Sequence, residues 1–225
     1  MGFERFSPVP RRIEIAGQPL EIWRPPDLEA LIDVAAFEAD ERIPYWADVW
    51  ESAIVLAEEL AELDGRGLSL LELGCGLGLP ALVAARAGFA VTATDYEEPA
   101  LEGVRFNAAR LGIDSIATRV LDWRQPSSDL GGFDRVVAAD VLYEPHHATA
   151  LAGVIAATLA PAGTALVADP CRARAAAFPD ACRAAGLSVE KTQARRPHGA
   201  TAGPAVEIYV VRVVRPPASS RAPRP

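Results

Sequence analysis

The stretch LELGCGLGLPALVAARAGFAVTATD, residues 71–95, decides the fold of this 225-residue chain. It starts inside an apolar run over 68–73 that is typical of a buried strand, and it then passes through Gly74, Gly76 and Gly78. A helix is expected over 79–88, closed by Gly88, and a second strand over 90–95. Strand, glycine turn, helix and strand form a βαβ unit, and glycines in such a turn let a ligand approach the backbone closely.

Asp95 ends the second of these strands, 21 positions after Gly74. Because the second strand lies beside the first, a carboxylate at this place meets ribose hydroxyls. Leu79 occupies the position where the strict dinucleotide fingerprint needs a further glycine, so the pyrophosphate version of the motif is not met. The sequence therefore predicts a ribose-containing ligand at this turn. The alternative is a glycine-rich turn that only packs a helix against a sheet.

The rest of the chain repeats the alternation of strand and helix. Further strands are expected over 115–122, 133–140, 164–169, 187–194 and 205–214. Further helices are expected over 97–111, 146–160 and 173–185, and Pro161 is expected to stop the second of them. This order favours an α/β, Rossmann-like, doubly wound fold with helices on both faces of a mostly parallel sheet. No helix separates the last two strands, so they are expected to pair antiparallel.

An N-terminal extension precedes this unit. Two short strands around Gly17 are expected within 12–24, followed by a helix over 28–39 that Asp27 caps, and a longer helix is expected over 46–63. The predicted organisation is a hairpin and helix extension over 1–45, a main domain over 46–214 and a flexible, proline-rich tail over 215–225.

Composition and charge narrow the class of protein. Half of the residues are apolar, which is enough for a substantial core, and 22 basic against 30 acidic residues leave a net charge of −8. That balance argues against a general nucleic-acid-binding coat. Three cysteines without a C-x-x-C pair indicate no disulfide scaffold and no zinc knot, and they favour a reducing cytoplasm. No apolar run is long enough for a membrane span or a signal core, so a cytoplasmic protein without a metal is predicted.

The motifs LELGCGLG (71–78) and TDYEEP (94–99) resemble those of class I S-adenosylmethionine-dependent methyltransferases. The resemblance implies a seven-stranded sheet with an antiparallel last strand, and S-adenosyl-L-methionine as the cofactor. It implies that the loop passes the methionine part of the cofactor and that Asp95 binds its ribose. It places Glu72 behind the loop in support of the amino end, and Tyr96 against the adenine. Cys75, whose small side chain fits the loop, is counted with the cofactor-binding residues Gly74 and Gly76.

Three further segments resemble the family 16 protein-lysine methyltransferases: WADVWESAIVLAEEL (46–60), LDW (121–123) and AADVLYEP (138–145). DPCR (169–172) resembles the branch of electron-transfer-flavoprotein lysine methyltransferases. The resemblance implies that Trp50 and Trp123 line the cofactor pocket, together with Ala139. It assigns Asp140 and Tyr143 of the D-x-x-Y signature to catalysis.

The chemistry of lysine methylation supports roles for Asp140 and Tyr143. Ligands of open α/β sheets bind beyond the carboxyl ends of the strands, where Asp140 is expected. A lysine amine has a pKa of about 10.4, so removing its proton at pH 7 costs roughly 4–5 kcal/mol. Because a carboxylate raises the pKa of a nearby amine, Asp140 is predicted to orient the amine rather than to act as a strong base. Tyr143 is expected to stack on the amine or bond to it. The alternative is a loop-capping aspartate and a tyrosine of the pocket wall.

A basic rim and three functions complete the predictions. The rim is expected from two loops on the cofactor face, as a solvated surface or as a recognition surface for an acidic partner; it comprises Arg172, Arg174, Arg195, Arg196 and His198.

The leading function is methylation of a lysine in a protein substrate. Val141-Leu142 stand where methyltransferases of DNA adenine and of protein glutamine carry two prolines, which argues against those substrates. The alternatives are a small-molecule, nicotinamide-like N-methyltransferase with 1–45 as a lid, and a non-catalytic cofactor-binding interaction protein.

Overall fold

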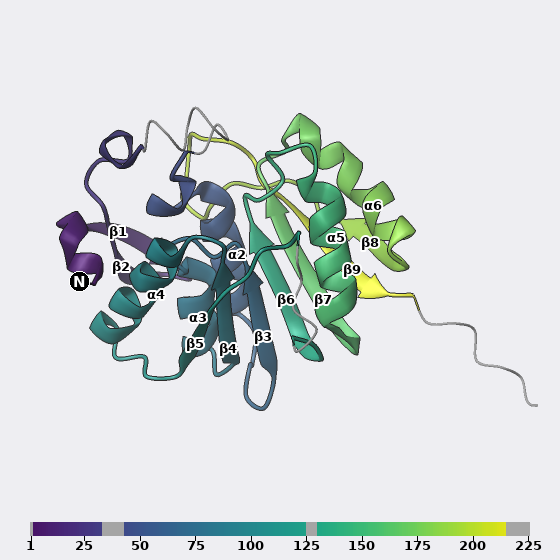
Figure 1. Ribbon diagram of the computed structural model, residues 1–225, viewed down its shortest axis with the longest axis horizontal. Coiled ribbons are helices and arrows are strands. Elements are labelled where there is room, and N and C mark those ends of the chain that lie inside the picture. The colour runs from purple at the N-terminus through teal and green to yellow at the C-terminus, as the bar shows by residue number, and fades with distance from the viewer. Residues whose placement is uncertain (1, 33–42, 125–129, 215–225) are drawn as a thin grey trace, which may run out of the picture.

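Seven strands form one sheet in the computed structural model, which describes residues 2–32, 43–124 and 130–214 (Figure 1). The strand order is β5-β4-β3-β6-β7-β9-β8. The bounds are β3 Ser69–Leu73, β4 Ala90–Asp95, β5 Ile116–Val120, β6 Phe133–Ala139, β7 Leu159–Asp169, β8 Leu187–Lys191 and β9 Glu207–Val213. Strands β3 to β7 pair in parallel, and β9 lies antiparallel between β7 and β8. The predicted α/β class, the seven strands and the antiparallel end are confirmed.

Helices cover both faces of the sheet. Helices α2 Glu51–Ala61, α3 Leu79–Arg86 and α4 Glu98–Arg110 share one apolar core, whereas α5 His147–Thr158 and α6 Phe178–Ala184 share the other. Strand β3 belongs to both, because Leu70 joins the first core and Leu71 and Leu73 join the second. Such a strand reads as a continuous apolar run, since both of its faces are buried. This is why the segment before the glycine loop shows no alternation.

The N-terminal hairpin packs onto the same core as α2 and α4. Strands β1 Val9–Ile15 and β2 Gln18–Arg24 pair antiparallel, as predicted, and the turn η1 Phe3–Phe6 precedes them. The buried amide of Asn107 on α4 accepts a hydrogen bond from the backbone N–H of Trp23 (2.7 Å) and donates one to its carbonyl (3.0 Å). Figure 1 shows the hairpin at the α4 end of the molecule, away from β8.

Several predicted helices are shorter than expected. The helix over 28–39 begins as a 3-10 turn, η2 Glu29–Leu31; Asp27 caps it as predicted, but Ile32 is already extended, and 33–39 lie outside the described residues. The helix over 46–63 begins only at Glu51, after the 3-10 turn η3 Tyr45–Ala47 and an extended Asp48. The helix over 173–185 is divided into the turn η4 Ala173–Ala177 and α6.

The prediction that Pro161 stops helix 146–160 is wrong in detail. Helix α5 ends at Thr158, because Leu159 turns to an extended conformation and starts the long strand β7, which contains Pro161. Leu159 pairs with Phe133 ahead of a register shift in the ladder between β6 and β7. The predicted tail, 215–225, lies outside the described residues. Among the described helices, none combines the length and the apolar character that a membrane span needs.

Candidate active site

A cavity of about 500 Å³ opens where β3, β4 and β6 end. Every residue that the sequence predicted as catalytic or cofactor-binding lines it: Trp50, Glu72, Gly74, Cys75, Gly76, Asp95, Tyr96, Trp123, Ala139, Asp140 and Tyr143. These residues come from positions 50 to 143 and meet because the carboxyl ends of parallel strands share one edge of the sheet. The volume lies within the range of about 300–1,000 Å³ that is usual for small-molecule sites.

The glycine loop is held in a conformation that side chains would disturb. Gly74 and Gly76 have φ values of 68° and 51°, in the left-handed region that glycine adopts at no steric cost. A Cβ on Gly74 would lie 2.9 Å from Val141, and one on Gly76 would lie 3.2 Å from the carbonyl oxygen of Trp46. The loop is tied to β4 by the backbone N–H of Cys75, which donates to the carbonyl of Thr94 (2.9 Å).

Asp95 is fixed by two backbone hydrogen bonds. Its Oδ2 accepts from the N–H of Gly76 (2.9 Å) and its Oδ1 accepts from the N–H of Glu97 (3.0 Å). The residue is 8% exposed, and burial raises the pKa of Asp95 to about 6, although both hydrogen bonds oppose the shift. Each carboxylate oxygen has a lone pair left for a further donor, such as a ligand hydroxyl.

Glu72 and Cys75 lie deeper beside the loop. The carboxylate of Glu72 is 1% exposed and accepts a hydrogen bond from the N–H of Ala81 in the first turn of α3 (2.9 Å). Burial raises the pKa of Glu72 well above its ordinary value, and burial likewise raises the pKa of the Cys75 thiol. A thiol with a raised pKa is a poor nucleophile, which agrees with a packing role for Cys75.

Aromatic rings form a continuous wall along the cavity. The centroid distances are 5.9 Å from Trp50 to Tyr45, 5.3 Å from Tyr45 to Tyr143, 4.8 Å from Tyr143 to His147 and 5.7 Å from His147 to Trp123. Nδ1 of His147 lies 2.7 Å from the carbonyl oxygen of Val141, and burial lowers the pKa of this histidine. Tyr45 and His147 were not predicted for the wall. The only hint of Tyr45 in the sequence is its place among the aromatic residues that precede α2.

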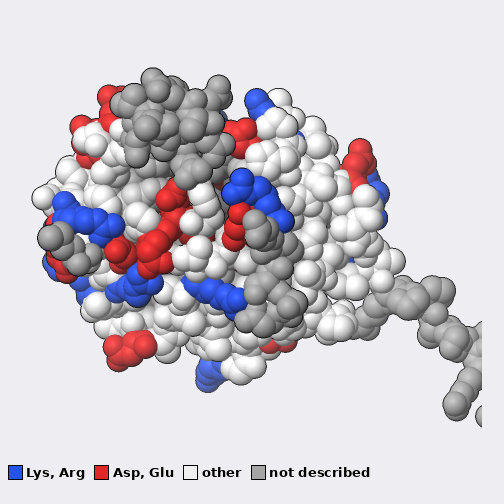
Figure 2. All heavy atoms as spheres, viewed as in Figure 1, with Lys and Arg blue, Asp and Glu red and all other residues white. Residues whose placement is uncertain are grey.

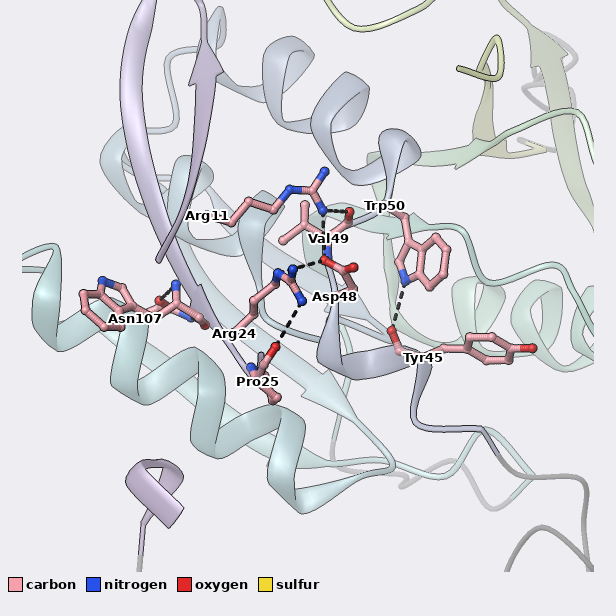
Figure 3. A network of polar contacts seen from close by, with 9 residues as sticks. Arg11, Arg24, Pro25, Tyr45, Asp48, Val49, Trp50 and Asn107 are labelled. Atoms are coloured by element: carbon pink, nitrogen blue, oxygen red, sulfur yellow. Dashed lines mark hydrogen bonds and ion pairs between the residues drawn. The ribbon is translucent and has the colours of Figure 1, made fainter. Parts of the chain in front are cut away.

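The hairpin supports this wall from behind (Figure 3). Nη1 of Arg11 donates to Oδ1 of Asp48 (2.9 Å) and to the carbonyl of Val49 (2.6 Å), and Nε of Arg24 lies 3.6 Å from the same Oδ1. One residue further, Nε1 of Trp50 donates to the carbonyl of Tyr45 (2.9 Å). The extension therefore braces the segment that carries the wall.

Asp140 is held in a polar environment that the sequence did not reveal. Its φ is 60°, its side chain is 6% exposed, and it lines the cavity. Oδ2 accepts a hydrogen bond from the hydroxyl of Ser52 in the first turn of α2 (3.3 Å). Oδ1 accepts from Nε of Arg172 (2.9 Å) and from its Nη2. Ser52 was missed, although it belongs to the tryptophan motif, and Arg172 was predicted for the rim rather than for Asp140.

Three other members of the predicted basic rim, Arg195, Arg196 and His198, also bond within the chain. Arg195 pairs with Glu58 and with Glu59, and Nε of Arg196 donates to the carbonyl of Gly203 (2.8 Å). The backbone N–H of His198 donates to Glu58 (2.7 Å). Figure 2 shows basic and acidic side chains interspersed over the left half of one face, while the right half is mostly uncharged. Recognition of an acidic partner stays a prediction. Arg174 and Arg196 are both exposed, and no ion pair is found for either within 2–32, 43–124 and 130–214.

The site fits S-adenosyl-L-methionine. A buried carboxylate with free lone pairs stands at the end of β4, the glycine loop leaves room where a Cβ would collide, and an aromatic wall faces both. A nucleoside with an amino-acid tail needs these three elements: a ribose acceptor, a close backbone and an apolar surface for the base. In the described parts of the chain, no group of three or more His, Cys, Asp and Glu side chains is arranged to hold a metal ion.

Fold and site together define a class I methyltransferase architecture. Solved structures with this fold include TrmN from Thermus thermophilus, with a TM-score of 0.55 and 23% identity over 72% of this chain and 49% of that one. A TehB-like methyltransferase from Corynebacterium glutamicum gives a TM-score of 0.55 and 18% identity over 80% and 93%. SpnF has the same fold but is named as a cyclase, not as a methyltransferase. Its TM-score is 0.59, with 20% identity over 71% of this chain and 80% of that one. These likenesses show the fold alone.

The chain belongs to the Lysine methyltransferase family, which it matches over residues 37–177. The zebrafish protein N-lysine methyltransferase METTL21A is 37% identical over 112 residues, which are 46% of this chain and 50% of that protein. The mouse EEF1A lysine methyltransferase 3 is 32% identical over 137 residues, or 59% of each chain. The human histone-arginine methyltransferase METTL23 is 33% identical over 106 residues, or 43% and 55%. The chain thus spans about half the length of the curated relatives it matches.

Proposed function

We propose that this chain methylates the side-chain amine of a lysine in a protein, with S-adenosyl-L-methionine as the methyl donor. The observation that carries the proposal is that Asp140 and Tyr143 line the same cavity as Asp95 and the glycine loop. Family membership supports the same reaction. A cofactor pocket and an acceptor pocket that share one cavity bring two reactants together, which is the main contribution a protein makes to group transfer.

The cofactor-side residues bind and orient. Asp95 would accept the ribose hydroxyls through the lone pairs that its two backbone bonds leave free. Gly74 and Gly76 allow the loop backbone to approach the amino-acid tail, and Glu72 holds α3 against the loop. Trp123 and Tyr96 offer ring surface for the base. When bound, S-adenosyl-L-methionine supplies a methyl group activated on a sulfonium sulfur.

The acceptor-side residues hold the lysine. Oδ2 of Asp140 has lone-pair capacity beyond the Ser52 bond, so it can accept a hydrogen bond from the amine. Burial raises the pKa of Tyr143 to about 12, so its hydroxyl stays protonated and can donate to the amine or accept from it. The rings of Tyr45 and Tyr143 lie 5.3 Å apart and offer π-faces to a lysine stem or to an ammonium.

Location and partner belong to the proposal as well. Three free cysteines, of which Cys171 is exposed, are consistent with a reducing cytoplasm. The partner is a protein that presents a lysine to the mouth of the cavity, where Tyr45 is 38% exposed.

The test is a labelling experiment with tritiated S-adenosyl-L-methionine. A heat-treated lysate of the cells that express this protein is incubated with the wild type, with the Asp95→Ala variant or without enzyme. We expect a discrete labelled protein band with the wild type alone, and methyl-lysine after acid hydrolysis of that band. Label confined to small molecules would refute the proposal in favour of the small-molecule alternative. Label recovered as methyl-arginine would refute the lysine assignment.

A further inference from the structure

An arginine stands behind the carboxylate that faces the acceptor. Nε of Arg172 lies 2.9 Å from Oδ1 of Asp140, and its Nη2 donates to the same oxygen. The main chain of Arg172 is also anchored, because its N–H donates to Oδ1 of Asp169 (2.7 Å), whose side chain is 0% exposed. Arg172 is therefore tied at both ends, at the point where β7 leads into η4.

Arg172 acts on the cavity through Asp140. Asp140 lines the cavity, whereas the lining residues found within the described ranges do not include Arg172 or Ser52. The guanidinium takes one carboxylate oxygen, and the Ser52 hydroxyl, at 3.3 Å, leaves the other with spare lone pairs. An acceptor amine thus meets a carboxylate whose charge is already compensated from the opposite side.

This pairing bears on the central difficulty of lysine methylation. Only the neutral amine can accept a methyl group, yet a lone carboxylate beside the amine would raise the amine's pKa and hold it as an ammonium. A fixed cation beside that carboxylate opposes the effect, because its charge disfavours the ammonium form. The carboxylate keeps its ability to accept a hydrogen bond.

We propose that Arg172 is a positioning residue that compensates the charge of Asp140, so that Asp140 orients the lysine amine without stabilising it as an ammonium ion. The ammonium loses its proton to water. The neutral amine then keeps one hydrogen bond, which one of its N–H groups donates to Asp140. This inference rests on the proposed function and adds to it the residue that tunes the acceptor site.

Other charged and titratable groups face this pair from several elements. Within the described parts of the chain, Oδ2 of Asp169 has no hydrogen-bond partner, and Asp169 interacts electrostatically with Asp140 and Arg172. Its register neighbour on β9, Glu207, is paired with Lys191. On the cavity side, the groups that interact with Tyr143 are Asp95, Glu144, Tyr45 and Asp140 itself. Among the described residues, Arg172 is the cation that forms an ion pair with Asp140.

The experiment measures kcat against pH. The labelled protein from the lysate experiment is expressed, purified and used at saturating concentration, because kcat reports the pKa of the lysine within the complex. The variants are Arg172→Gln, which removes the charge, and Arg172→Lys, which keeps it. Arg183→Gln is the matched control, since it removes an exposed charge from α6, the helix that follows η4, and Arg183 lies outside the rim.

We expect the rising limb of the Arg172→Gln profile to move to higher pH by about one unit, the low end of the shift that a neighbouring charge produces. At a pH below the limb, kcat then falls about tenfold while KM does not rise. Arg172→Lys should restore most of the profile, and Arg183→Gln should leave it in place. In the Asp140→Asn variant the charge of Arg172 is no longer compensated, so the limb should move to lower pH; adding Arg172→Gln removes both charges and should return the limb toward its wild-type position.

Different negative results distinguish a failure of the proposed function from a failure of this inference alone. A wild type that forms no methyl-lysine refutes the proposed function, and the inference falls with it. An active wild type with an unshifted Arg172→Gln limb, or with a loss confined to KM, overturns the inference alone and makes Arg172 structural. Calorimetric binding of S-adenosyl-L-methionine checks that each variant is folded. If Arg172→Gln does not fold, the double variant decides: a limb that returns from the Asp140→Asn position toward the wild-type position supports the inference, and the same limb as Asp140→Asn overturns it.

Discussion

The Asp95→Asn variant should respond to pH differently from the wild type when the cofactor-free protein unfolds. Burial raises the pKa of Asp95 to about 6, from its ordinary value of 3.8. The folded state therefore binds this proton more tightly than the unfolded chain does. The wild type must lose unfolding free energy as the pH rises from about 4 to about 6, after which the loss is constant. Asparagine carries no titrating proton at this position, so the variant lacks this slope.

The size of the effect follows from the shift. A difference of about 2 pKa units corresponds to about 3 kcal/mol of unfolding free energy. Asparagine can accept only one of the two backbone bonds, from Gly76 or from Glu97, which costs the variant about 1–3 kcal/mol at every pH. Because that cost is constant, the difference in unfolding free energy between the wild type and Asp95→Asn should change in favour of the variant by up to about 3 kcal/mol between pH 4 and pH 7.

Urea unfolding of both proteins at several pH values, followed by tryptophan fluorescence, measures the gap. Asp134→Asn is the matched control, because hydrogen bonds from Ser69 lower the pKa of Asp134 and reverse the expected trend. The wild type is therefore expected to have a higher unfolding free energy than Asp134→Asn at neutral pH, and to lose this difference as the pH falls below about 4. If the unfolding free energies of the wild type and of Asp95→Asn keep the same separation from pH 4 to pH 7, the burial argument for Asp95 is wrong.

Three further predictions concern the two sides of the cavity. The Asp140→Asn variant should keep most of its cofactor affinity and lose at least about tenfold in turnover, roughly 1.4 kcal/mol of barrier; near-normal turnover would make Asp140 structural. Arg11→Ala removes two hydrogen bonds to the segment before α2 and should cost about 1–2 kcal/mol of stability and weaken cofactor binding in calorimetry. The exposed Arg12→Ala serves as its control, and equal effects of the two would contradict the brace. If the rim steers an acidic partner, reversing Arg174 and Arg196 to glutamate should flatten the fall of kcat/KM with salt and spare cofactor affinity; an unchanged salt slope would leave the rim a solvated surface.

Sequence reasoning worked best where the signal is local. The strand run at 68–73, the glycines that follow and the acid at the end of the next strand lie within one βαβ unit, so their spacing alone predicts where they meet. The same reasoning places Ala139 and Asp140 at this edge, because β6 runs parallel to β3. It failed at the ends of elements, as at Leu159, where the transition from helix to strand depends on pairing with β6 rather than on the proline two residues later.

The sheet, the glycine loop and the edge where the site lies could all be predicted from the sequence, since strand direction and turn chemistry follow from residues close together in the chain. Only the tertiary structure decided what surrounds Asp140. Ser52 is 88 positions away from Asp140 in the sequence and Arg172 is 32 positions away, and neither sequence separation corresponds to a helical or strand period. The same holds for Arg11, which supports a cavity wall from a hairpin 37 positions upstream. Such contacts arise because folding brings distant side chains to one place, where burial makes an uncompensated charge costly and so favours a partner.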